Sequence, residues 1–127
     1  MRVLLDTNAL MMPAQFRIDL FDELRQLVGA FEPLVLEQGV KELEGLSTGL
    51  GRDGAAARCG LALAEKCRAV RPEHPVCGSA DDQIIAYAAK DRCYVVTNDR
   101  QLREALLARG IGVISMRKQK RLELIQR

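Results

Sequence analysis

Short apolar runs and longer amphipathic stretches alternate along the chain. The apolar runs cover residues 3–5, 33–36, 94–97 and 111–114. Their nearly continuous hydrophobicity is typical of strands that are buried on both faces. Between these runs, apolar residues recur at steps of three or four, which predicts helices. The predicted helices cover residues 18–28, 37–46, 55–67, 80–90 and 100–109.

Alternating strands and helices predict an α/β fold whose parallel sheet is covered on both faces. Because the crossover connections are right-handed, the carboxyl ends of the strands meet at one edge of the sheet, where such folds bind ligands. The chain length fits one domain that covers residues 1–127. The glycine-rich residues 49–54 predict a flexible loop, and residues 117–127 form a basic C-terminal segment.

The composition is that of an ordinary globular domain, 48% hydrophobic and 28% charged. A net charge of +2 does not indicate nucleic-acid binding by itself, so that argument depends on where the charges lie. No apolar run approaches the ~20 residues that span a bilayer, and the N-terminus becomes acidic too soon for a signal peptide. We therefore expect no membrane segment and a cytoplasmic location.

The cysteines are widely and irregularly spaced, and His74 is the only histidine of the chain. Because zinc ligands usually come in close pairs, we expect free thiols rather than a zinc site. A disulfide stays open if the source organism is hyperthermophilic. The cysteines are Cys59, Cys67, Cys77 and Cys93.

Acidic residues occupy the positions that a parallel sheet brings to its ligand-binding edge. Asp6 directly follows the first predicted strand, and Asp99 follows a late one. Asp81 and Asp82 open a predicted helix, and Glu42 lies in the helix after the second strand. Each acid alone has a plainer interpretation, because carboxylates also cap helices and favour their first turns.

Carboxylates that are crowded together on one edge would repel each other and resist ionisation. A divalent cation removes this repulsion, and a carboxylate cluster without histidine suits Mg²⁺ or Mn²⁺ rather than zinc. Such a site is suited to phosphodiester hydrolysis, since the metal activates water and neutralises the charge of the phosphate. The sequence contains no nucleophile elbow, P-loop or HExxH motif that would indicate another chemistry.

Four blocks of sequence, in this order, resemble the PIN domain family. The blocks are Asp6-Thr7-Asn8, Glu42-Leu43, Asp82-Gln83-Ile84-Ile85-Ala86 and Thr97-Asn98-Asp99. The resemblance extends over nearly the whole chain, to about residue 114. It implies a three-layer α/β/α sandwich with a central parallel sheet, and a ribonuclease that depends on Mg²⁺ or Mn²⁺ and acts on RNA, with single-stranded RNA as the expected substrate.

The same resemblance implies four catalytic acids that also bind the metal: Asp6, Glu42, Asp82 and Asp99. Asp82 is chosen as the third acid because the residues after it fit the register of the family. Its neighbour Asp81 is a further candidate metal ligand, or it tunes the pocket, or it only caps the helix.

Three polar residues are candidates for a supporting role, in which they would orient ligands or water. They are Asn8, Thr97 and Asn98. Capping of the following helices is the plainer interpretation of these residues.

Within the family, two subgroups fit. The segments around residues 13–21 and 80–82 resemble archaeal relatives of the PIN nucleases of the eukaryotic small-subunit processome, which favours rRNA or RNA processing. VapC-type toxin ribonucleases are the alternative, and the family also implies a homodimer.

Two further hypotheses stay open. The first is a PIN fold that binds RNA or a protein without cutting, and the intact acids argue against it. The second is another α/β protein with an acidic pocket, such as a receiver domain. It would need a lysine late in the chain, in a strand context that this sequence lacks.

Cationic residues offer contacts to phosphates, although a basic run is often only a solvated face. Arg52 and Arg58 flank the glycine-rich segment. The other candidates lie in the C-terminal segment and are Arg117, Lys118, Lys120, Arg121 and Arg127.

Overall fold

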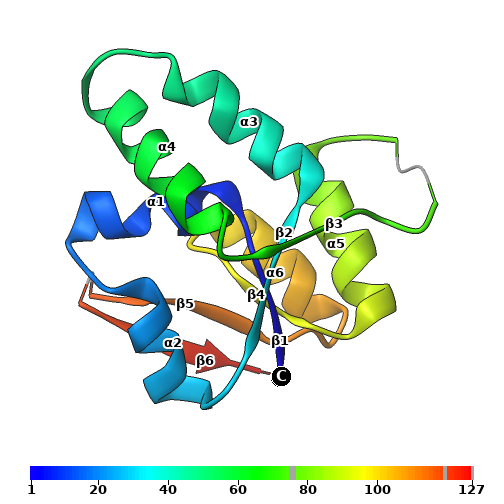
Figure 1. The fold of residues 1–127 in the computed structure, drawn as a ribbon. Helices are drawn as coiled ribbons and strands as arrows, with labels where there is room; N and C mark the ends of the chain where they lie inside the picture. The colour runs from blue at the N-terminus through cyan, green and yellow to red at the C-terminus, as the bar shows by residue number, and fades with distance from the viewer. Residues whose placement is uncertain (75–76, 119, 127) are drawn as a thin grey trace.

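The computed structural model describes residues 1–74, 77–118 and 120–126, so Arg127 of the basic segment lies outside the described residues. In the described part, one sheet has the strand order β3-β2-β1-β4-β5-β6 (Figure 1). Its strands are β1 (Arg2–Leu5), β2 (Glu32–Leu36), β3 (Arg68–Val70), β4 (Tyr94–Val96), β5 (Val113–Arg117) and β6 (Arg121–Ile125).

The strands β1 to β5 run parallel, and β6 runs antiparallel to β5. The register pairs Leu5 of β1 with Val96 of β4, and Leu4 with Leu34 of β2. The residues that follow β1, β2 and β4 therefore reach the same edge of the sheet. The predicted α/β fold with a parallel central sheet is confirmed, and β6 is an antiparallel addition to it.

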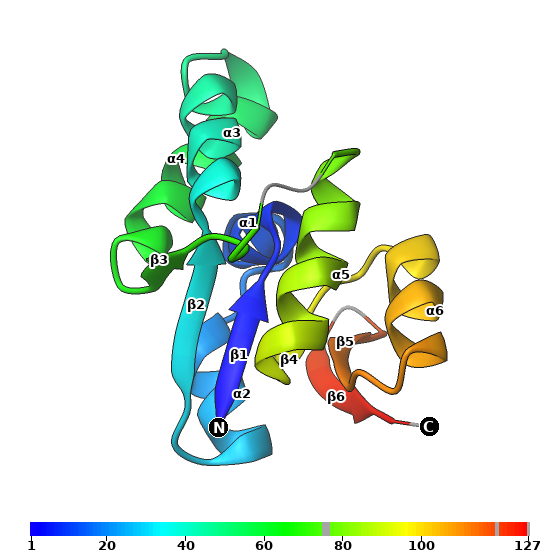
Figure 2. The ribbon, with the colours of Figure 1, turned by 90° about the vertical axis from the view of Figure 1, so that its right-hand side faces the viewer.

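Helices cover both faces of the sheet, which gives three layers. The helices α1 to α4 pack on one face, whereas α5 and α6 pack on the other (Figure 2). Their bounds are α1 (Thr7–Phe16), α2 (Leu20–Val28), α3 (Glu37–Ser47), α4 (Gly51–Ala64), α5 (Ala80–Asp91) and α6 (Arg100–Ala108).

The close packing of α4 holds α3 and α1 in place. A Cβ atom added at Gly60 of α4 would lie 3.2 Å from the Leu43 side chain and 3.4 Å from the Leu10 carbonyl oxygen. Leu43 and Leu10 are fully buried in the core on this face. The small residue therefore lets three helices meet closely, and this fixes the position of α3 at the edge of the sheet.

The structure corrects the predicted loop at residues 49–54. The helix α4 begins at Gly51, so most of this segment is helical, and α3 and α4 form a hairpin that extends beyond the sheet (Figure 1). A Cβ atom at Gly54 would lie 2.0 Å from the Gly49 carbonyl oxygen. The glycines thus allow a tight helix-to-helix turn rather than a flexible loop.

The cysteines Cys59, Cys67, Cys77 and Cys93 are free thiols, and Cys93 is buried. Burial raises the pKa of the Cys67 and Cys93 thiols to about 11. In the described part of the chain, no helix has the length and apolarity that crossing a membrane requires.

Candidate active site

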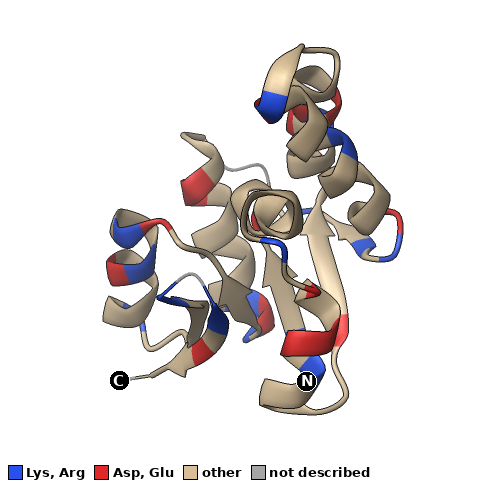
Figure 3. Ribbon diagram, turned by 90° about the vertical axis from the view of Figure 1, so that its left-hand side faces the viewer, with Lys and Arg blue, Asp and Glu red and all other residues tan. Residues whose placement is uncertain are grey.

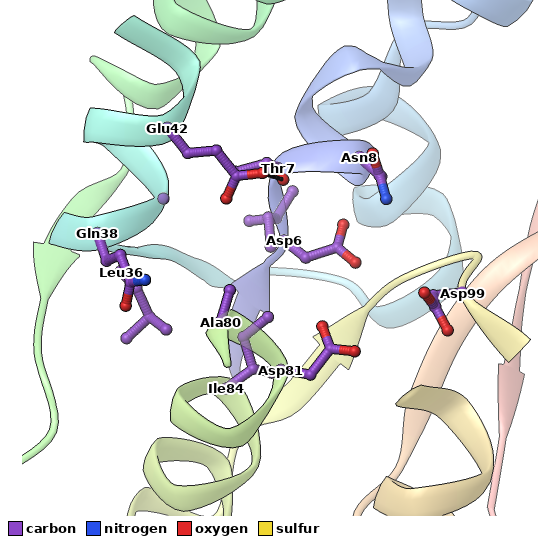
Figure 4. Close-up of a pocket in the computed structure, with 12 residues that line it drawn as sticks. Asp6, Thr7, Asn8, Leu36, Gln38, Glu42, Ala80, Asp81, Ile84 and Asp99 are labelled. Carbon is purple, nitrogen blue, oxygen red and sulfur yellow. Dashed lines mark hydrogen bonds between the residues drawn. The ribbon is translucent and has the colours of Figure 1, made fainter. Parts of the chain in front are cut away.

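An acidic cavity of about 110 Å³ lies at the carboxyl edge of the sheet. Four of the side chains that line it carry carboxylates, and they come from the segment after β1, from α3, from the start of α5 and from the segment after β4 (Figure 4). They are Asp6, Glu42, Asp81 and Asp99. Because one water needs ~10–15 Å³ of such space, the cavity has room for an ion with several waters.

Asp6 is the most buried of these acids, with 7% of its surface exposed. It is the N-cap of α1, and its carboxylate accepts a hydrogen bond of 2.6 Å from the Ala9 backbone N–H. The Thr97 hydroxyl is a second hydrogen-bond partner of this carboxylate. These bonds fix the direction of the Asp6 side chain, which points into the cavity (Figure 4).

Asp99 is held in the same way at the start of α6. Its carboxylate caps the helix by accepting a hydrogen bond of 2.9 Å from the Leu102 N–H, and its own N–H donates to the Thr97 hydroxyl oxygen at 3.1 Å. Thr97 is fully buried and therefore connects Asp6 and Asp99 through one hydroxyl group.

Asp81 and Asp82 lie in different surroundings. Asp81 lines the cavity together with Ile84, which lies three residues later on the same face of α5. Asp82 is not among the lining residues, because its carboxylate accepts a hydrogen bond of 2.9 Å from the Ser79 N–H. The structure thus brings Asp81, and not Asp82, together with Asp6 and Asp99.

A capping box holds Asp82 in this place. The Ser79 hydroxyl oxygen accepts from the Asp82 N–H at 3.3 Å, while the Asp82 carboxylate accepts from Ser79. A Cβ atom at Gly78, whose φ is +125°, would lie 2.2 Å from this carboxylate. The spacing Ser79-x-x-Asp82 is the sequence signature of a capping box, and it could have indicated this role.

Glu42 lies on α3, across the cavity from Asp99 (Figure 4). Gln38 lies one helical turn before it and lines the same cavity, although the sequence did not single it out. The Glu42 side chain is exposed and accepts a hydrogen bond of 3.4 Å from the Thr7 hydroxyl. Glu42 is therefore held less firmly than Asp6 and Asp99.

The predicted supporting residues have three different positions. Asn8 is exposed and lines the cavity together with Asp6. Thr97 is fully buried and contacts the Asp6 carboxylate. The Asn98 side-chain oxygen accepts a hydrogen bond of 2.8 Å from the Met116 backbone N–H. Asn98 therefore ties the segment after β4 to the end of β5.

The surroundings of the acids favour their protonated forms. Burial raises the pKa of Asp6 to about 6, and the charges of Asp81 and Asp99 add to the rise, whereas the bonds from Thr97 and Ala9 oppose it. Burial also raises the pKa of Asp81, with Asp99 and Asp82 as further causes. These carboxylates resist carrying their negative charges together, as expected for acids that are crowded in one pocket.

The donor set fits a hard divalent cation in its chemistry, because it consists of carboxylate oxygens. Within residues 1–74, 77–118 and 120–126, however, no three acidic, histidine or cysteine side chains are grouped closely enough to hold a metal ion. Bound metal would therefore require some side chains to turn toward a common point. Glu42 is exposed and has the freedom to do so.

Comparisons with known proteins identify the family and the fold of the chain. A family model described as "PIN like domain" matches residues 3–119 of the chain. Ribonuclease VapC9 of Archaeoglobus fulgidus is 34% identical over 118 residues, which cover 91% of this chain and 83% of that protein.

Among solved structures, the fold is similar to that of the PIN domain endonuclease Utp24, with a TM-score of 0.79 and 27% sequence identity. The match covers 99% of this chain and 92% of that one. VapBC2 from Rickettsia felis, bound to a DNA fragment from its promoter, matches with a TM-score of 0.68 over 92% of this chain and 100% of that one. Its sequence identity is 12%, so this second likeness concerns the fold alone.

Proposed function

Because the chain belongs to the PIN domain family, we propose that it is a metal-dependent endoribonuclease that hydrolyses RNA phosphodiester bonds in the acidic cavity. One observation carries this proposal. The buried Asp6 carboxylate, fixed by two hydrogen bonds, lines one cavity with three further carboxylates. Burying acids together in this way is unfavourable for their ionised forms and suits a site that binds a cation.

We assign the metal to Asp6, Asp81 and Asp99, with Glu42 as a further ligand that closes the site. When bound, Mg²⁺ or Mn²⁺ would supply an activated water and neutralise charge on the phosphate. The protein preorganises two of these ligands, since Asp6 and Asp99 are held by helix-capping bonds and by Thr97, whereas Asp81 and Glu42 would turn toward them when the metal binds. Asn8, exposed at the rim, is positioned to contact a phosphate or a water.

This assignment replaces Asp82 by Asp81 as the third acid. The support is geometric, because the Asp82 carboxylate accepts a hydrogen bond within the capping box that it forms with Ser79. Asp82 keeps an indirect role, since its charge is one cause of the raised pKa of Asp81.

We further propose that the RNA is single-stranded and that the protein acts in RNA processing. The support is the resemblance of the segments around residues 13–21 and 80–82 to PIN nucleases of the small-subunit processome. The likeness to the PIN domain endonuclease Utp24, which covers nearly the whole of both chains, is consistent with it. A toxin ribonuclease is the second candidate, favoured by the 34% identity with VapC9. A small antitoxin gene next to the gene of this protein would identify the protein as a toxin ribonuclease, and its absence would favour the role in RNA processing.

A homodimer and a cytoplasmic location are further parts of this proposal; the homodimer rests on the family alone, and the location rests on the sequence pattern. Sedimentation of the purified protein at several concentrations tests the dimer. A single species with the mass of one chain at all concentrations would exclude it.

A cleavage assay tests the proposed activity. The purified protein should cut single-stranded RNA with Mn²⁺ or Mg²⁺ and stop when EDTA is added, and Asp6→Asn should abolish the cleavage. Asp19→Asn is a matched control, because Asp19 caps α2 through the Asp22 N–H at 3.1 Å and does not line the cavity. Equal cleavage by the wild type and Asp6→Asn would overturn the proposal.

A further inference from the structure

The C-terminal cations form a compact surface instead of a tail. Arg117 ends β5, Arg121 begins β6, and Lys118 and Lys120 lie in the turn between them. All four side chains are exposed, and we call this surface the basic hairpin. Figure 3 shows lysine and arginine gathered around this turn and on the neighbouring helix α6.

The pairing of the hairpin places like charges opposite each other. Arg117 and Arg121 are direct cross-strand partners in the β5–β6 ladder. Like charges directly opposite each other destabilise a sheet. Glu123 lies near Arg117, with 4.0 Å between the nitrogen and the oxygen, and it balances only part of this charge. A bound polyanion would turn the repulsion into a favourable interaction.

The helix α6, which neighbours the basic hairpin, also carries a cation in an unfavourable position. Arg100 is the first residue of α6, directly after the N-cap Asp99, and it is exposed. The positive end of the helix dipole disfavours a cation in this position. Arg103, one turn later on α6, is half-buried.

The basic hairpin has a fixed position relative to the acidic cavity. The parallel pairing of β4 with β5 continues past Val96 and Ile114 into a bond from the Thr97 N–H to the Ile114 oxygen, at 3.0 Å. Asn98 then accepts from the Met116 N–H at 2.8 Å. Arg117 follows Met116 directly, about 3.3 Å further along the strand. The hairpin therefore begins beside the segment that carries Asp99.

We propose that the basic hairpin and Arg100 bind the phosphates of the RNA strand on the Asp99 side of the cavity, with Asn98 as the residue that positions the hairpin. This inference rests on the proposed nuclease function and deepens it. Exposed cations contact the backbone without reading bases, so the surface sets affinity and orientation rather than sequence preference.

Binding of a fluorescein-labelled single-stranded RNA in EDTA, read by anisotropy at several salt concentrations, tests this inference apart from catalysis. For single strands, each lost phosphate contact reduces the slope of log K against log salt by about 0.7. Arg117→Gln/Arg121→Gln should therefore lower the slope by about 1.4. If the affinities of the wild type and this variant for RNA converge at 1 M salt, the variant binds roughly 25-fold more weakly at 0.1 M salt.

Arg92→Gln/Arg109→Gln is the matched control. It removes the same charge at the opposite edge of the sheet, where both residues line a separate cavity near the start of β4. This variant should bind as the wild type does. A second hairpin variant, Lys118→Asn/Lys120→Gln, guards against misfolding of the first, since asparagine tolerates the positive φ of 55° at Lys118.

The outcomes separate the two proposals. If the wild type cleaves RNA but both hairpin variants, folded by circular dichroism, keep its affinity and salt slope, the hairpin inference is overturned and the nuclease proposal stands. An acidic protein partner would then be the better match for these cations. A wild type that binds but never cleaves RNA overturns the nuclease proposal, and equal losses in the hairpin and control variants overturn the assignment to the hairpin.

Discussion

Asp81 and Asp82 are adjacent in α5, yet Asp81 lines the acidic cavity while Asp82 accepts a hydrogen bond from the Ser79 backbone at 2.9 Å. One residue along a helix is a rotation of about 100°, which is enough to turn a side chain from the cavity into the cap. The two aspartates should therefore respond differently to the same substitution.

Asp81→Asn should reduce kcat/KM for RNA cleavage by at least about 100-fold, because it removes a proposed metal ligand. Asp82→Asn should leave cleavage within a few-fold of the wild type and cost about 1 kcal/mol of stability, because it weakens the capping box. Single-turnover cleavage and urea unfolding of the two variants, measured side by side, test both expectations.

The opposite pattern would restore the assignment made from the sequence. If Asp82→Asn loses cleavage while Asp81→Asn retains it, then Asp82 leaves its cap when metal and RNA bind. Loss of cleavage in both variants with unchanged stability would mean that both aspartates serve the site.

The raised pKa of Asp6 predicts how the stability of the metal-free protein depends on pH. In the folded protein this pKa is about 6, against an ordinary value of 3.8. Between these values the folded state binds more protons than the unfolded state, so stability falls as pH rises from about 4 to about 6 and is level above that. Because the pKa of Asp6 is higher by about two in the folded state, the free energy of unfolding falls by roughly 3 kcal/mol over this pH range.

Asp6→Asn should remove this part of the pH dependence, because asparagine does not titrate and still caps a helix. In EDTA at pH 8 the variant should be more stable than the wild type, by an amount on the order of 1–3 kcal/mol, and the two should converge near pH 4. Chemical unfolding across this range is the measurement. Parallel profiles for the two proteins would show that Asp6 has an ordinary pKa.

The strand-end acids could be predicted because a carboxylate follows each of these apolar runs within a few residues. Asp6 follows Leu5, and Asp99 comes three residues after the last residue of β4. In a parallel sheet such positions must share an edge, whatever the details of packing. The position of Glu42 was harder to predict from the sequence, because it depends on how α4 packs against α3.

Other parts of the fold were hidden by local sequence. Pro13 interrupts the pattern of α1, although Asp6 caps the helix and Leu10 is buried within it. The charges around the hairpin obscured β6, whose Leu122 is buried in the core. In each case tertiary packing outweighed the local signal.

Two helical glycines should give opposite results when they are replaced by alanine. Gly45 lies inside α3 with no atom within 4 Å of an added Cβ, so Gly45→Ala should stabilise the protein by about 0.5–1 kcal/mol. Gly54→Ala should destabilise it by about 1–3 kcal/mol, because the Cβ would collide with the Gly49 backbone. Thermal and urea unfolding measure both, and stabilisation by Gly54→Ala would contradict the tight turn between α3 and α4.

Thr97 supports the site through one hydroxyl group that bonds to the Asp6 carboxylate and accepts from the Asp99 N–H. Valine has a similar shape but lacks the hydroxyl, so Thr97→Val leaves the partly buried Asp99 N–H and the buried Asp6 carboxylate each short of one partner. We expect a loss of about 1–3 kcal/mol in stability.

The same substitution should affect catalysis through the positions of the two aspartates. Thr97→Val should lower kcat about 10- to 100-fold, as supporting residues of metal sites do, with little change in KM, because Thr97 does not touch RNA. Thr97→Ser keeps the hydroxyl and should restore most of kcat. If serine and valine lower kcat equally, the role of Thr97 is to fill space, and the hydrogen bonds to Asp6 and Asp99 do not position the acids.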